Sequence, residues 1–179
     1  LGDRITIAGT DMFAGGDSIS AVTLGGVPAM VTSSTNEEVV IIANAGPTEG
    51  SANLGDVVIT GSSGVTTRGV NAWTYSTIDN VSPEYGQAGT LVTISGVRLF
   101  AGGEEVQEVR LNGIAVARLV SESETEIVVE TADHAVVVDQ PGQIAIDISN
   151  GQSILSTSEA YVYKPRGTID AVNPVQGQE

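Results

Sequence analysis

The stretch VTISGVRLFAGGEEVQEVRLNG at residues 92–113 decides the fold, because the chain contains it twice. The earlier copy, ITIAGTDMFAGGDSISAVTLGG at residues 5–26, aligns with it without a gap, so that Ile7 corresponds to Ile94 at an offset of 87 residues. Other matched pairs are Thr6 and Thr93, Gly9 and Gly96, Phe13 and Phe100, Val22 and Val109, Leu24 and Leu111, and Gly26 and Gly113. Repetition at a constant offset indicates an architecture built from repeated units.

A second repeated phrase marks where each unit begins. STIDNVSPEYGQ at residues 76–87 recurs as GTIDAVNPVQGQ at residues 167–178. The repeat predicts a first domain at residues 1–75 that lacks its leading strand and a complete domain at residues 76–164. Residues 165–179 are then a linker and the first strand of a further repeat. We interpret the chain as a window of a longer array. The alternative is a polymer in which one protomer's tail supplies the leading strand of the next.

The hydrophobic pattern has a period of two, with many β-branched residues, which is typical of strands. Gly-Gly, Asn-Gly and Pro-Gly pairs separate these runs, and TADHAVVVDQPG at residues 131–142 is expected to be a loop or a strand edge. About seven short strands in roughly 90 residues predict an all-β protein made of two tandem immunoglobulin-like β-sandwiches. The alternating runs are RITIAG, ISAVTLG, LVTISG, VQEVRLNG, TEIVVET, GQIAIDIS and AYVYKP.

An ordered set of motifs resembles a known family. Residues 77–163 carry I-x-x-V-x-P-x-x-G-x-x-G-T-x-V-T-I-x-G, then F-x-G-G, V-x-L-N-G, TEIVV, G-x-I-x-I and a closing A-Y-x-Y. This order resembles the TIG (or IPT) domain, and residues 1–75 carry it without the leading strand. The resemblance implies an immunoglobulin-like sandwich of the E-set type. Such domains occur in plexin-type receptor ectodomains, in bacterial and protist surface proteins and in some transcription factors.

Charge and composition exclude several functions. Seven basic and 22 acidic residues among 179 give a net charge of −15, which opposes binding to a phosphate backbone. Cysteine is absent, so disulfides and thiolate metal sites are excluded. No apolar run approaches the roughly 18 residues of a membrane span, so we expect neither nucleic-acid binding nor membrane insertion by this segment.

Catalytic chemistry has few candidates. His134 is the single histidine and has no neighbouring nucleophile motif, so we expect it in an exposed loop. Carboxylate clusters fall on predicted turns and solvent faces, at Glu37 and Glu38, at Glu104 and Glu105, and at Glu122, Glu124 and Glu126. The sequence therefore predicts no enzyme, no catalytic residue and no cofactor-binding residue. Four aromatic residues close the two repeats, and we expect them in core or inter-domain packing, with a sugar-stacking platform as the alternative: Trp73, Tyr75, Tyr161 and Tyr163.

The sequence offers candidate positions for a bound Ca²⁺ ion and for a glycan. No calcium-binding loop pattern is present, but acidic residues gather near the domain junctions, where a Ca²⁺ ion would stiffen the joint. These junction residues are Asp79, Glu84, Asp170 and Asp3. Asn80-Val81-Ser82 is a glycosylation sequon, which makes Asn80 a candidate glycan site in a secreted protein.

The linkers are short, at residues 75–77 and 164–167, and the second contains proline. Such connections do not behave as free tethers, so the domains are expected to sit end to end at a restricted angle. Lys164 and Arg166 stand out in this acidic chain, and we expect them to pair with the acidic edge of a neighbouring domain.

These features favour a non-catalytic structural or adhesive segment of an extracellular or cell-surface repeat protein. Its role is that of a stiff spacer or of a building block of a surface fibre or flagellar appendage. The expected partners are other copies of the repeat, in the same chain or in neighbouring protomers, with other surface proteins or glycans as further candidates. The alternatives are a receptor-ectodomain stalk and a carbohydrate-binding accessory module of a secreted enzyme. A transcription-factor TIG domain is disfavoured by the sign of the charge.

Overall fold

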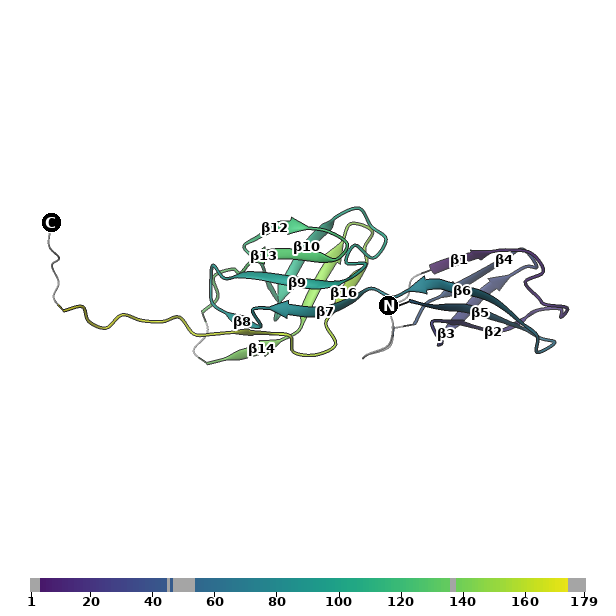
Figure 1. Cartoon of the computed structure of the whole chain (residues 1–179), viewed down its shortest axis with the longest axis horizontal. Helices are drawn as coiled ribbons and strands as arrows, with labels where there is room; N and C mark the ends of the chain where they lie inside the picture. The colour runs from purple at the N-terminus through teal and green to yellow at the C-terminus, as the bar shows by residue number, and fades with distance from the viewer. Residues whose placement is uncertain (1–3, 45, 47–53, 136–137, 174–179) are drawn as a thin grey trace.

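The computed structural model describes residues 4–44, 46, 54–135 and 138–173. Two β-sandwiches follow one another along the long axis, and the chain continues beyond the second (Figure 1). We call residues 4–75 domain 1, residues 76–164 domain 2 and residues 165–173 the tail. Within these ranges the structure contains strands and turns but no helix, and therefore no helix able to cross a membrane. The predicted fold class, all-β with tandem immunoglobulin-like sandwiches, is confirmed.

Domain 1 is one continuous antiparallel ladder in the order β1-β4-β3-β2-β5-β6. The long strand β3 pairs with β2 through Val27–Ala29 and with β4 through Met30–Ser34. It therefore belongs to both sheets of the sandwich, β1-β4-β3 and β3-β2-β5-β6. Its strands are β1 (Arg4–Ala8), β2 (Ile19–Leu24), β3 (Val27–Ser34), β4 (Glu38–Ile42), β5 (Leu54–Gly61) and β6 (Thr66–Thr74).

Domain 2 contains three sheets, ordered β12-β13-β9-β7, β11-β10-β15-β16 and β14-β17-β8. The leading phrase of the repeat forms β7, which is the edge strand beside β9. The strands are β7 (Thr77–Ser82), β8 (Tyr85–Gly86), β9 (Leu91–Val97), β10 (Val106–Leu111), β11 (Ile114–Ala115), β12 (Arg118–Glu122), β13 (Glu126–Glu130), β14 (Gln140–Gly142), β15 (Ile144–Ile148), β16 (Ser153–Leu155) and β17 (Tyr161–Tyr163).

The backbone repeats as the sequence does. Six residues with positive φ in domain 1 have counterparts 87 positions later, and the β2–β5 bulge at Ile19/Ala21 recurs between β10 and β15 at Val106/Glu108. A residue with positive φ is rare outside tight turns, so this match is a strong sign of one shared fold. The pairs are Asp11 and Arg98, Ala14 and Ala101, Gly15 and Gly102, Gly25 and Asn112, Gly26 and Gly113, and Gly64 and Gly151.

The predicted strands and turns are confirmed. Each alternating run named above contains a strand, and Asn112 (φ 52°) and Gly113 (φ 75°) form the turn that joins β10 to β11. The described residues of the 131–142 segment are loop until β14 begins at Gln140. Each domain has its own core, built from the inward positions of its strands. The tail forms no strand in residues 165–173, so the first strand of a further repeat stays a prediction.

Candidate functional site

His134 lies in the loop between β13 and β14. Its Nε2 is 3.3 Å from Oε1 of Gln140, and its ring meets the Tyr163 ring edge-on at a centroid distance of 5.6 Å. It borders an open groove of about 470 Å³ that is also lined by Asn112 and Asp139. Neither contact of His134 resembles the nucleophile–base pair of a hydrolase.

Two of the clustered carboxylates have structural roles. Oε2 of Glu124 accepts a hydrogen bond from the Phe100 amide at 3.2 Å, and Oε2 of Glu122 accepts one from the Val106 amide at 3.0 Å. In domain 1 the side-chain oxygen of Asn36 accepts the Phe13 amide at 3.0 Å, as Glu124 does for Phe100. Each of these side chains accepts a hydrogen bond from a backbone N–H group that would otherwise be unpaired. The other clustered glutamates are exposed: Glu37, Glu38, Glu104, Glu105 and Glu126.

The four closing aromatic residues pack in the cores, as predicted. Tyr161 and Tyr163 are fully buried and meet edge-on, with centroids 5.3 Å apart and planes at 84°. In domain 1, Trp73 and Tyr75 repeat this geometry at 5.5 Å and 80°, but both are only half-buried. Edge-on pairs of this kind are a favourable aromatic arrangement.

Burial governs the ionisation of these phenols. Burial, together with the neighbouring Tyr163, raises the pKa of Tyr161 to about 12, against the opposing effect of the Thr90 and Thr131 side chains. Burial also raises the pKa of Tyr163 and of Tyr75. A phenol held neutral in this way is suited to packing and not to proton transfer near neutral pH.

The junction between the domains consists of Tyr75 and Ser76, because β6 ends at Thr74 and β7 begins at Thr77. The Tyr75 ring packs against the core of domain 1, and its hydroxyl donates to the Leu24 carbonyl at 3.4 Å. A Cβ placed on Gly46 would lie 2.8 Å from this ring. One of the two linker residues is therefore held by domain 1.

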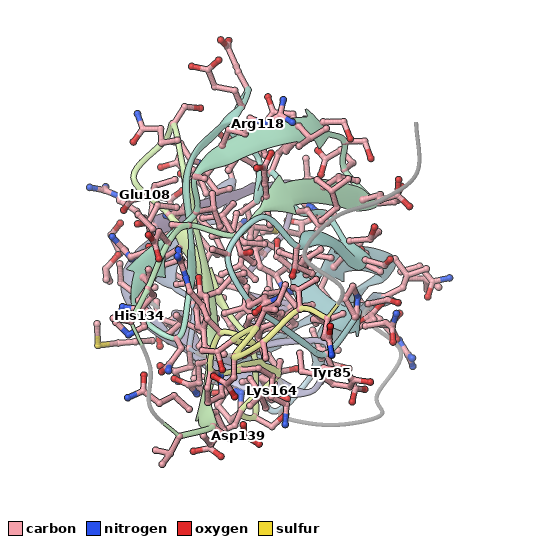
Figure 2. The ribbon with its side chains drawn as sticks, turned by 90° about the vertical axis from the view of Figure 1, so that its left-hand side faces the viewer. Tyr85, Glu108, Arg118, His134, Asp139 and Lys164 are labelled. Carbon is pink, nitrogen blue, oxygen red and sulfur yellow. The ribbon has the colours of Figure 1, made fainter. Side chains whose placement is uncertain are left out.

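The far end of domain 2 holds the start of the tail. Nζ of Lys164 lies 2.5 Å from Oδ2 of Asp139 and 5.4 Å from the centroid of the Tyr85 ring, and Arg166 forms an ion pair with Asp133. Figure 2 shows His134, Asp139, Lys164 and Tyr85 together at this end. The sequence predicts that these basic residues pair with a neighbouring domain, and this prediction is wrong. They pair with domain 2 itself, because the β13–β14 loop places Asp133 and Asp139 beside the point where the chain leaves the domain.

The candidate calcium residues that the structure describes do not form a cluster of three carboxylates. Oδ1 of Asp79 accepts from the Thr77 hydroxyl at 2.8 Å, and Asp79 and Glu84 line a shallow groove of about 280 Å³ beside β7. Asp170 is exposed in the tail, and Asp3 lies outside the described residues. No cluster of three or more His, Asp or Glu side chains suited to a metal occurs in the described ranges, and a junctional Ca²⁺ stays a prediction.

Asn80 is exposed on the edge strand β7. Its side chain lies beside the same shallow groove. A glycan at this position stays a prediction.

Sequence reasoning missed one polar cluster in domain 1. The carboxylate of Asp56 accepts the Asn71 amide at 2.7 Å and forms an ion pair with Arg68. These two contacts, with the Asn71 hydrogen bond first, hold the pKa of Asp56 below its usual value. Asn71 has a φ of 50°, so the cluster stabilises a bend in β6. The sequence signal was weak: an asparagine that tolerates positive φ, 15 residues from its partner.

The family model for the IPT/TIG domain matches residues 76–163. Domain 2 belongs to the IPT/TIG domain family. Domain 1 has the same turns and the same β2–β5 bulge 87 residues earlier, and the same edge-on aromatic pair 88 residues earlier, so it is a second copy of the IPT/TIG repeat. No curated protein matches the sequence significantly.

Solved structures that match this chain include proteins of Bacteroides ovatus and Prevotella bryantii and the plexin A4 extracellular region. One is the SGBP-B of a Bacteroides ovatus mixed-linkage glucan utilization locus, in complex with a mixed-linkage heptasaccharide; it is 17% identical over 92% of this chain and 42% of its own, with a TM-score of 0.39. The surface glycan-binding protein PbSGBP-B of Prevotella bryantii is 18% identical over 87% of this chain and 36% of its own, with a TM-score of 0.36. The plexin A4 extracellular region is 23% identical over 96% of this chain and 15% of its own, with a TM-score of 0.45. The chain thus spans less than half the length of each.

Proposed function

We propose that this chain is a non-catalytic structural segment of an extracellular or cell-surface repeat protein, in which consecutive IPT/TIG domains form a stiff spacer or a building block of a fibre. The observation that carries this proposal is the junction. Two residues connect β6 to β7, and Tyr75 is packed into domain 1. A connection this short leaves few free torsions for the domains to swing about.

The chemistry of the surface supports a spacer. The net charge of −15 favours solubility and disfavours partners that carry phosphate backbones. Six of the seven aromatic side chains are buried or half-buried, and Tyr85, 60% exposed, lies under the Lys164 ammonium group. A sugar-stacking platform uses exposed aromatic faces, so these positions favour the structural role over the carbohydrate-binding alternative.

The proposal is tested by measuring how far the domains swing. Because the chain has no cysteine, the double variant Met30→Cys and Leu155→Cys carries one spin label on each domain, at side chains that are 58% and 56% exposed. We expect electron–electron double resonance to give a single narrow distance distribution. The matched control carries the same labels and a short Gly-Ser insertion between Tyr75 and Ser76, and it should give a clearly broader distribution. Equal widths for the two proteins would overturn the stiff spacer.

A further inference from the structure

The last strand of domain 2, β17, lies between two other strands. It pairs antiparallel with β14, with Gln140 opposite Tyr163, and parallel with β8, with Tyr163 opposite Gly86. The next residue, Lys164, continues the pairing with β8, because its backbone N–H donates to the Gly86 carbonyl at 2.8 Å. Backbone hydrogen bonds therefore hold the chain on domain 2 as far as Lys164.

The Lys164 side chain contacts groups beside both neighbouring strands. Its Nζ lies 2.5 Å from Oδ2 of Asp139, the residue before β14, and 5.4 Å from the centroid of the Tyr85 ring on β8 (Figure 2). An ammonium group is stabilised both by an adjacent carboxylate and by the face of an aromatic ring. Lys164 thus connects the two strands that flank β17.

The residues that follow are held as well. Arg166 forms an ion pair with Asp133, and the Gly167 N–H donates to Oε1 of Gln87 at 3.4 Å. The aspartate belongs to the β13–β14 loop and the glutamine follows β8, so these contacts again come from both sides of β17. We call residues 164–167 the exit segment.

The connection between the two domains is held in a different way. The Tyr75 ring packs against the core of domain 1, and neither Tyr75 nor Ser76 has a charged side chain. In the exit segment, the four charged side chains of the two ion pairs are between 41% and 70% exposed. Salt screens exposed charges but does not weaken apolar packing. The two connections should therefore respond differently to ionic strength.

We propose that the exit segment is an ionic clamp. At low ionic strength it fixes the direction in which the chain leaves domain 2, and at high ionic strength it releases the chain. This inference rests on the proposed spacer function, because it makes the stiffness of one connection depend on the surrounding salt. The spacer then bends at the exit segment in concentrated salt, whereas the connection at Tyr75 stays stiff.

The test places one pair of spin labels across each connection. Leu155→Cys with Ile169→Cys spans the exit segment, at side chains that are 56% and 84% exposed, and Met30→Cys with Leu155→Cys spans the connection at Tyr75. Distance distributions are measured at about 0.01 M salt, where the screening length is about 30 Å, and at about 1 M, where it is about 3 Å. We expect the 155–169 distribution to become about twice as wide in concentrated salt. The 30–155 distribution should keep its width.

Two isosteric variants remove the acidic partners of the clamp. Asp139→Asn neutralises the partner of Lys164, and Asp133→Asn neutralises the partner of Arg166. The double variant should have a wide 155–169 distribution already at low salt. Glu104→Gln is the matched control, because it neutralises an exposed carboxylate of domain 2 outside the clamp, and it should behave as the wild type does.

The outcomes separate the clamp from the stiff spacer. A 155–169 width that changes neither with salt nor in the double variant would overturn the clamp. An equal salt response at both connections, or an equal effect of Glu104→Gln and Asp139→Asn, would also overturn it, because repulsion between acidic surfaces would then explain the data. Failure of the stiff spacer is seen separately, as a 30–155 distribution that is as wide at low salt as that of the Gly-Ser insertion control.

Discussion

The two domains share a local sequence pattern but differ in how completely it is buried. Ile94 on β9 is fully buried, whereas the matching Ile7 on β1 is half-buried. Ile154 on β16 is 5% exposed, and the matching Thr67 on β6 is exposed. In the described part of the chain, fifteen buried residues form the core of domain 2 and eight form that of domain 1, so the first core is the smaller.

The difference shows what a leading strand contributes. Turns, bulges and the edge-on aromatic pair recur in both domains, because short-range sequence specifies them. Burial of the strand beside the edge does not recur, because it depends on β7, which comes from the residues before the turn motifs. The conformation of the turns thus depends on the sequence within each repeat, whereas the stability of a domain depends also on the strand that covers this edge of its sandwich.

The largest expected effect is a difference in unfolding free energy between the domains. Burying Ile78 and Val81 and completing the burial of Val92 and Ile94 should stabilise domain 2 by about 4 kcal/mol relative to domain 1. Since Trp73 lies in domain 1, its fluorescence should change at a lower urea concentration than the circular dichroism signal of domain 2. The predicted difference would be contradicted if the Trp73 fluorescence changed at the same urea concentration as the circular dichroism signal of domain 2, or at a higher one.

Much of this architecture was predictable because its signals are local. Period-two alternation identified the strand at 91–97, and Asn112-Gly113 identified the β10–β11 turn, since both residues adopt positive φ. The offset of 87 residues then carried both assignments from domain 2 to domain 1. The division of β3 between two layers was not predicted, because it depends on which strands flank it and not on its own residues.

The polar contacts were less predictable. Lys164 finds Asp139 and the Tyr85 ring within its own domain, and Arg68 finds Asp56. Long charged side chains reach partners that are distant in sequence, and surface pairs of this kind contribute little energy, so sequence patterns constrain them weakly. The aromatic positions were predictable, because large rings at the end of a strand pattern bury too much apolar area to lie free.

A matched pair of glycine substitutions sharpens the comparison at intermediate size. Gly96→Ala should lower the unfolding free energy of domain 2 by about 3 kcal/mol, because the new methyl group collides with the Thr77 carbonyl and forces β7 away. Gly9→Ala should cost domain 1 less than about 1 kcal/mol, because only the mobile end of Met12 must shift. Urea titrations of the two variants measure both costs. Equal costs would mean that β7 does not press on Gly96.

The smallest expected effect is a difference in alkaline sensitivity. The pKa of Tyr161 rises from 10.0 to about 12 in the folded state, so the unfolded chain loses this proton first as the pH increases. The unfolding free energy of domain 2 should then be constant below pH 10 and fall by about 2 kcal/mol as the pH passes through 12. At the matching position domain 1 has Trp73, which does not ionise, and Tyr75 is only half-buried, so domain 1 should lose less. Urea titrations across this pH range measure both slopes. Tyr161→Phe should flatten the slope of domain 2, and an unchanged slope in that variant would assign the effect to other groups.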